Sequence, residues 1–185
     1  MIEFDDHLIY GTGKEAAVAG FANELIVLAM LMTNYPNSSK VDMPLASYDI
    51  IIERTTGSHA SFLRAQVKTA SKSIPFTGGS RGGVDRSYDP QIHQNKQYTQ
   101  NITTSDLVIG IHRSKGQTVL YLIPTLIISI LGQKSLANTK ADVFSDWQII
   151  NLCDKESELK EHLRQRITTS HPLMKTDSFN TWIST

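Results

Sequence analysis

The sequence is poor in the features that define several protein classes. Its single cysteine, Cys153, excludes a disulfide framework and a cysteine-based zinc site within the chain. No segment near the N-terminus combines positive charge, an apolar run and a small-residue cleavage site, so we do not expect a secretory signal. The most apolar stretches, residues 25–32 and 120–131, are too short or too interrupted to span a bilayer. We therefore expect a cytoplasmic protein without a membrane partner.

Net charge is zero, but the charge is distributed unevenly along the chain. Residues 1–58 hold 3 Lys and Arg against 8 Asp and Glu, a balance of −5. Residues 59–100 hold 6 against 2, a balance of +4. The middle segment is thus the only clearly basic one. It is either a solvated face of ordinary composition or a surface for an anionic partner.

The order of apolar patterns predicts one mixed α/β domain over residues 1–185, with a core at about 14–152 and a helical tail at 153–185. The first pattern, residues 14–33, is rich in Ala, Leu and Met and apolar on nearly every face, which predicts a buried helix. Further strands are expected at 48–53, 62–69, 106–112, 118–123 and 147–152, and further helices at 125–131 and 156–167. The first two of these strands form a hairpin across "TTGS".

Two segments between the expected strands lack a clear pattern. Residues 75–90, "PFTGGSRGGVDRSYDP", hold four glycines and two prolines, which predicts a long surface loop. Residues 91–103 are polar, and a short helix is one option for them.

The hairpin carries an arrangement that suits metal-assisted chemistry. Asp49 opens its first strand, while Gln66 and Lys68 lie two residues apart on its second strand and so share one face. Magnesium prefers oxygen ligands, and phosphodiester hydrolysis needs a bound cation and a positive charge near the developing negative charge. The alternative is a purely structural role, in which Asp49 caps a turn and Lys68 is an exposed residue at the end of a strand. The six histidines are scattered without ligand spacing, which argues against a histidine-based metal site.

The pattern Asp49…Gln66-Val67-Lys68 resembles the PD-(D/E)xK nuclease superfamily, in a branch that includes an intron homing endonuclease and restriction-associated nucleases and tolerates Gln in place of the acid. "QYTQNITTSDLVIGI" and "VLYLIPT" resemble that branch's later strands, and "FTGGSRGGVDRSY" resembles a Gly/Arg loop of restriction-type members. Tyr48 stands where the superfamily has Pro. The resemblance implies a restriction-endonuclease-like fold, in which helices flank a mixed central sheet.

The resemblance also implies a role for each motif residue. Asp49, Gln66 and an acid on the preceding helix would hold Mg²⁺, for which Mn²⁺ can substitute, and Lys68 would assist the attacking water. The helix acid is Glu24 or Glu15, which point to opposite sides of one helix, and the spacing to the following turn favours Glu24. Because a carboxamide adds no charge, the site should bind its ion more weakly than a three-acid site.

The basic segment supplies the expected DNA contacts. Lys72 precedes the Gly-rich loop, which carries Arg81 and Arg86, and arginine suits phosphates and guanine edges. We expect an endonuclease acting on double-stranded DNA, first of all a type II restriction endonuclease or its catalytic subunit, working as a homodimer or with a separate recognition subunit. A homing endonuclease, a Holliday-junction resolvase and a catalytically inactive DNA-binding protein of the same fold are the alternatives.

Overall fold

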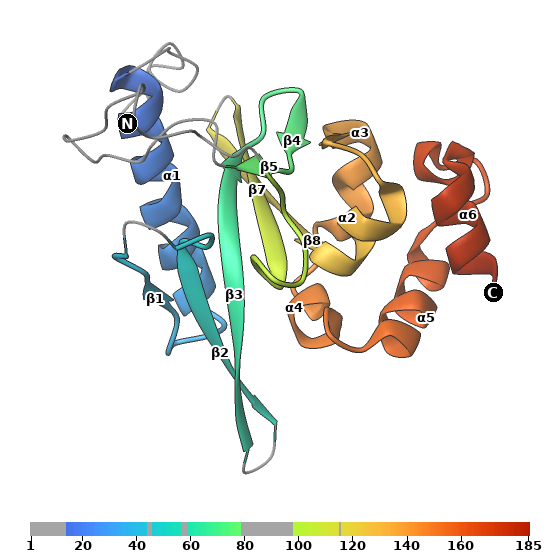
Figure 1. The fold of residues 1–185 in the computed structure, drawn as a ribbon, viewed down its shortest axis with the longest axis horizontal. Helices are drawn as coiled ribbons and strands as arrows, with labels where there is room; N and C mark the ends of the chain where they lie inside the picture. Colours follow the sequence, from blue (N-terminus) through green and yellow to red (C-terminus); the bar gives the residue numbers. More distant parts are fainter. Residues whose placement is uncertain (1–13, 44–45, 57–58, 79–97, 115) are drawn as a thin grey trace.

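The computed structural model describes residues 14–43, 46–56, 59–78, 98–114 and 116–185. Its centre is a five-stranded sheet in the order β1-β2-β3-β7-β8 (Figure 1). The strands are β1 (Ser39–Lys40), β2 (Ile50–Thr56), β3 (His59–Thr69), β7 (Leu107–Ser114) and β8 (Gln117–Pro124). Neighbouring strands are antiparallel except for β3 and β7, which run parallel. The sheet is therefore mixed, as the sequence predicts.

The predicted hairpin is confirmed as β2–β3, and so is the alternation of side chains along β3. Ile50 lies opposite Ala65, and the pairing continues along the hairpin to Thr56 and His59. Along β3, Leu63, Ala65 and Val67 are buried, whereas Arg64, Gln66 and Lys68 between them are only partly covered. One face of this strand thus belongs to the core, and the other is free to present polar side chains.

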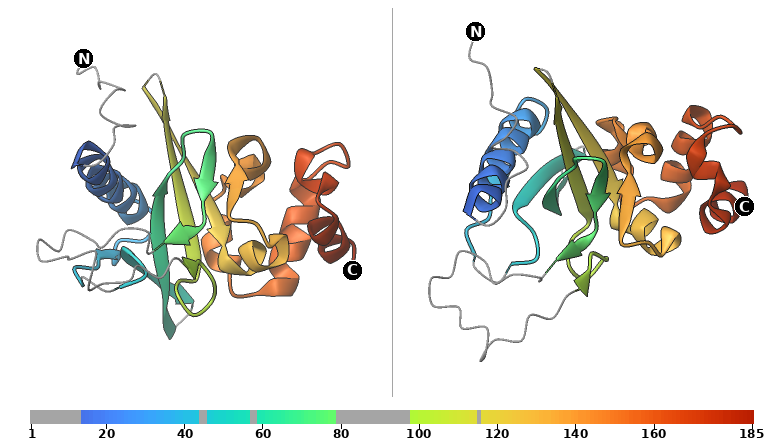
Figure 2. Two further views of the ribbon diagram at one scale, coloured as in Figure 1. Left: turned by 45° about the horizontal axis from the view of Figure 1, so that its top comes forward. Right: turned by 90° about the horizontal axis from the view of Figure 1, so that it is seen from above.

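Strands β7 and β8 are covered on both faces. Residues 107–111 and 120–124 are buried without interruption, which is typical of strands that helices cover on both faces of the sheet. Helix α1 (Lys14–Met32) covers one face, and the helices that follow β8 cover the other (Figures 1 and 2). The strands predicted at 106–112 and 118–123 are confirmed as β7 and β8, which form a hairpin, and the predicted helix is confirmed as α2 (Thr125–Leu131).

The predicted buried helix is present as α1, but only one of its faces is buried. Asn23, Val27 and Leu31 face the sheet and are buried. The opposite face carries four exposed apolar side chains, which are Val18 (70% exposed), Phe21 (53%), Leu25 (45%) and Met32 (46%). Composition predicted the helix but could not show which of its apolar faces the sheet would cover.

The C-terminal region is helical, which corrects the strand expected at 147–152. Helix α4 (Gln148–Leu152) lies there instead, and Asp146 Oδ1 accepts a hydrogen bond of 2.9 Å from the Gln148 N–H at its start. Such an acceptor favours a helix start over a strand. The charged helix expected nearby is confirmed as α5 (Glu156–Arg166), with Leu159 and Leu163 fully buried.

The remaining elements are short. They are β4 (Ser73–Pro75), β5 (Thr77–Gly78), β6 (Tyr98–Thr99), β9 (Ser135–Ala137), α3 (Asn138–Ala141), a 3₁₀ turn at Asp142–Phe144, a second at Pro172–Lys175, and α6 (Asp177–Ser184). Strands β4 and β5 occupy the first part of the segment expected to be a loop, and residues 79–90 lie outside the described residues. Of residues 91–103, the described part holds β6 and a turn rather than a helix. Among the described helices, none has the length and apolarity needed to cross a membrane.

Substitution of two glycines by alanine tests this packing, because the expected changes in stability have opposite signs. A Cβ at Gly110 in β7 would lie 2.5 Å from Ile74 Cγ1, so Gly110→Ala should destabilise the fold by about 1–3 kcal/mol through overpacking. A Cβ at Gly20 in α1 would meet no heavy atom within 4 Å, so Gly20→Ala should stabilise it by about 0.5–1 kcal/mol. Urea denaturation of both variants measures the difference. Shifts of the same sign would contradict the described packing.

Candidate functional site

Asp49 lies at the corner where β2 begins, between its two neighbouring strands. Its N–H donates to Ala65 O (2.9 Å), and its carbonyl accepts from Val41 N (2.8 Å). Its side-chain oxygen Oδ2 accepts hydrogen bonds from Val67 N (2.7 Å) and from Gln66 Nε2. The pairing of β2 with β3 stops at Ile50 and Ala65, so the Asp49 side chain takes the place of the next backbone partner. Two of the predicted metal ligands, Asp49 and Gln66, are therefore in direct contact.

Helix α1 brings Glu24 to the same corner. Asn23, which is 1% exposed, donates from Nδ2 to Thr69 Oγ1 over 2.9 Å and so ties α1 to β3 next to Lys68. The Glu24 carboxylate is close enough to raise the pKa of Asp49 and to oppose the lowering of the pKa of Lys68. The structure thus gathers Glu24, Asp49, Gln66 and Lys68. Their catalytic and metal-binding roles remain predictions.

Burial dominates the electrostatics of this corner. It raises the pKa of Asp49 to about 6, against hydrogen bonding from Val67 N and the positive charges of Lys68 and Lys40, and with the help of Glu24. Burial also lowers the pKa of Lys68, against the negative charges of Asp49 and Glu24. Both shifts favour the neutral form of the group, which is the usual effect of removing a charge from water. A carboxylate and an amine perturbed in this way are typical of functional sites.

Lys40 also belongs to this corner, and the sequence analysis missed it. Its Nζ lies 2.9 Å from Glu24 Oε2 and 3.8 Å from the centroid of the Phe21 ring. It reaches this position because β1, only two residues long, pairs Lys40 with Ile50 next to Asp49. No sequence pattern marks so short a strand, so nothing in the sequence could have linked Lys40 to Glu24.

The two carboxylates of this corner fit one hard cation, whereas Gln66 is turned away from such a role. Asp49 and Glu24 supply two carboxylates that repel each other, and a bound cation would relieve that repulsion. Gln66 turns its amide nitrogen, not its oxygen, toward Asp49. Its oxygen would reach a cation beside Asp49 only if the carboxamide turned over. Among the described residues, no three His, Cys, Asp or Glu side chains cluster as a metal site.

The other predicted residues are not part of the described cluster. Lys72 is exposed in the turn after β3, where its carbonyl accepts from Asn138 N (3.0 Å). Arg81 and Arg86 lie outside the described residues, as does the side chain of Glu15. Whether these residues contact DNA stays a prediction.

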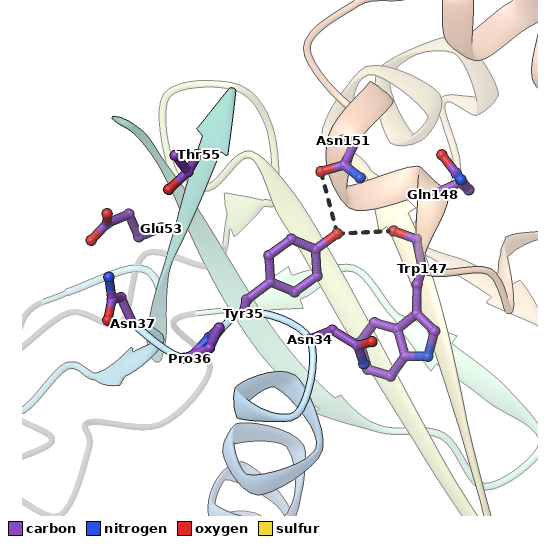
Figure 3. A pocket seen from close by; sticks show the side chains of 9 residues that line it. All are labelled: Asn34, Tyr35, Pro36, Asn37, Glu53, Thr55, Trp147, Gln148 and Asn151. Atoms are coloured by element: carbon purple, nitrogen blue, oxygen red, sulfur yellow. Dashed lines mark hydrogen bonds between the residues drawn. The ribbon is translucent and has the colours of Figure 1, made fainter. Parts of the chain in front are cut away.

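A separate cavity of about 480 Å³ opens at the C-terminal end of α1, beside the later part of β2 (Figure 3). In it Tyr35 points toward α4, and its Oη lies 3.3 Å from Asn151 Oδ1 and 3.4 Å from Trp147 O. Of the nine described residues that line this cavity, only Glu53 carries a carboxylate and none carries a cation. The chemistry of hydrolysis needs charged groups in close contact, so the Asp49 corner is the better candidate.

The raised pKa of Asp49 predicts a pH-dependent cost to the fold. The folded state holds the Asp49 proton more tightly than the unfolded state. The fold therefore loses stability as the pH rises from about 4 to about 6, and the loss is complete above about pH 6. We expect Asp49→Asn to raise the free energy of unfolding at pH 8 by about 2–3 kcal/mol, and by much less at pH 4. Denaturation at both pH values measures this difference.

Asp42, an exposed acid just after β1, provides the control. Asp42→Asn should change stability by less than about 0.5 kcal/mol at either pH. If Asp49→Asn is no more stable than the parent at pH 8, burial of the ionised Asp49 carboxylate does not destabilise the fold, and the prediction is wrong.

Comparisons with known proteins do not assign the chain to a family. No protein-family model matches it, and no curated protein sequence is similar to it. The solved structure of a bacterial homing endonuclease is similar at 14% sequence identity with a TM-score of 0.43, over 63% of this chain and 72% of that one. A likeness of this strength supports no conclusion about fold or activity, so the function has to be argued from the residues themselves.

Proposed function

We propose that this protein is a metal-dependent DNA endonuclease of the PD-(D/E)xK type. The observation that carries the proposal is the meeting of Asp49, Glu24 and Lys68 at one half-buried corner of the sheet, with their charges interacting. Two acids and a lysine so placed are what metal-assisted phosphodiester hydrolysis needs. The motif pattern of the sequence is the second support.

In this proposal the carboxylates of Asp49 and Glu24 hold Mg²⁺ or Mn²⁺, with Gln66 as the third predicted ligand. A bound cation would polarise the phosphoryl oxygen and lower the pKa of the attacking water. Lys68 orients that water or stabilises negative charge developing on the phosphate. Its lowered pKa follows from burial, which the negative charges of Asp49 and Glu24 oppose. Because the site has only two carboxylates, DNA phosphate would contribute the missing negative charge.

Lys40 adds a feature to this scheme that the motif does not contain. In the described structure it neutralises Glu24 across 2.9 Å. A cation bound to Glu24 would compete with this lysine. Lys40 would then be released toward solvent or toward a DNA phosphate.

The proposal also covers the biological role of the endonuclease. A type II restriction endonuclease or its catalytic subunit remains the first choice, on the strength of the Gly/Arg loop with Arg81 and Arg86. A homing endonuclease or a Holliday-junction resolvase would use the same chemistry. One site cuts one strand, so a second copy or a recognition subunit is required for double-strand cleavage. The exposed apolar face of α1, with Phe21 and Leu25, is typical of a protein–protein interface and supports such a partner.

A DNA-binding protein without nuclease activity is the second candidate function. The orientation of Gln66 favours it, because a carboxamide nitrogen facing Asp49 does not bind a cation. The two candidates differ in one measurable property, which is cleavage.

Supercoiled plasmid DNA incubated with the protein and Mg²⁺ separates these possibilities. We expect nicked or linear product with Mg²⁺, and none with EDTA or with Asp49→Ala. Lys68→Ala should lower the cleavage rate by at least about 10²–10³-fold, because it removes the charge beside the reacting phosphate. DNA binding by Lys68→Ala, measured by fluorescence anisotropy, should remain.

Lys155→Ala is the matched control, since this exposed lysine pairs only with Glu158 in the neighbouring turn of α5 in the described structure. It should cleave at the parent rate. Full activity of Lys68→Ala would overturn the mechanism. Mg²⁺-independent binding without any cleavage by the parent protein would favour the inactive DNA-binding protein.

A further inference from the structure

Gln100 is a buried polar residue that the proposed mechanism does not use. It follows β6, is 1% exposed, and is fixed through its backbone, because its N–H donates to Phe76 O over 2.8 Å. Its side chain points at Gln66, with Nε2 lying 3.4 Å from Gln66 Oε1. A fully buried carboxamide in contact with a motif residue raises the question of what it does there.

The partners of Gln100 determine which way its carboxamide faces. Its Nε2 lies 3.3 Å from the backbone carbonyl of Ser47, which can only accept a hydrogen bond. Its Oε1 accepts from Thr104 Oγ1 (2.7 Å) and Ser105 Oγ (2.9 Å). Turning this group over would place an oxygen against the Ser47 carbonyl. The nitrogen of Gln100 is therefore the atom that faces Gln66.

The hydrogen-bond partners of Gln66 fix the orientation of its carboxamide in the same way, at its oxygen and at its nitrogen. Toward Gln100 it has to present an acceptor, which is Oε1. At the other end its Nε2 donates to Asp49 Oδ2 and lies 3.3 Å from the carbonyl of Val67, which also can only accept. Turning over the Gln66 carboxamide would create a donor–donor contact with Gln100 and an acceptor–acceptor contact with Val67 O. The two carboxamides thus form a chain from the Ser47 carbonyl to the Asp49 carboxylate.

We infer that Gln100 is a positioning residue, which holds Gln66 as a hydrogen-bond donor to Asp49 and prevents its oxygen from reaching a metal ion. This inference rests on the proposed function, because it gives Gln66 a different part in the same site. An acid at position 66, as in the superfamily pattern, could not donate to an ionised Asp49. The glutamine is then a donor that matches Gln100, and Asp49 and Glu24 are the protein ligands of the cation.

The first test reads the orientation of Gln66 without requiring catalysis. In ¹⁵N-labelled protein, the side-chain amide signal of Gln66 is identified by its loss in Gln66→Ala. We expect its protons to exchange slowly with solvent, and to remain protected when Mg²⁺ is added. Gln100→Leu removes the N–H donor that faces Gln66 Oε1, so Gln66 can turn over, and it should accelerate this exchange at least about tenfold. Gln100→Glu, which keeps the shape but cannot donate to Ser47 O or Gln66, should do the same.

Asn101→Ala is the matched control for a loosened turn. Asn101 Oδ1 accepts from Thr103 N (2.9 Å) and Thr103 Oγ1 (2.7 Å) in the same turn, and in the described structure Asn101 makes no hydrogen bond to the Gln66 side chain. Exchange of the Gln66 amide should stay within about twofold of the parent in this variant. Equal acceleration in Asn101→Ala and Gln100→Leu would mean that Gln100 only stabilises the turn, and would overturn the inference.

The second test measures coupling through cleavage. If Gln100 acts through Gln66, Gln100→Leu should lower kcat about tenfold in the parent and less than about twofold in the Gln66→Ala background. The same fold-change in both backgrounds would contradict it. A parent protein that never cleaves DNA would refute the proposed function while leaving the amide result to stand. Loss of Gln66 protection on adding Mg²⁺, in a protein that does cleave, would refute only the positioning role.

Discussion

The hydrogen bond from Val67 N to the Asp49 carboxylate, 2.7 Å long, is the interaction on which the candidate site depends. It forms just before β2 begins, where β3 continues beyond the pairing of the two strands, so a side chain completes the sheet in place of a strand. The strand edge thereby fixes a carboxylate in a half-buried position. Helix α1 then adds Glu24, and β3 adds Lys68 from its partly covered face. Each of these groups is placed by backbone geometry rather than by a flexible loop, which favours a preorganised site.

The charges at this corner oppose the stability of the fold. Burial favours the neutral forms of both Asp49 and Lys68, and the two acids repel each other. The lysines partly offset this, with Lys40 paired to Glu24 and Lys68 interacting with both acids. A core of strands β7 and β8, buried on both faces, supplies the stability that allows such an arrangement. A site of this kind is expected where a cation or an anionic substrate completes the charge balance.

The sequence predicted the parts that depend on local pattern. The period of two along β3 placed Gln66 and Lys68 on one face, and the apolar patterns located α1, β7 and β8. The sequence did not predict the features that depend on packing between distant segments. The exposed face of α1, for example, could not be predicted from the residues of the helix alone. Lys40 and Gln100 reach Glu24 and Gln66 only through non-local contacts, so no spacing rule could find them.

The central claim is that Asp49 is kept as a buried charge in order to bind a divalent cation, and thermal unfolding with and without Mg²⁺ tests it most directly. A ligand that binds only the folded state raises its stability, so at pH 8 and ten times the dissociation constant we expect the midpoint to rise by about 3–6 °C. The Asp49→Asn variant should show a higher midpoint than the parent without Mg²⁺ and no further rise with it. A parent protein whose midpoint does not respond to Mg²⁺, or an equal response in Asp49→Asn, would contradict the account.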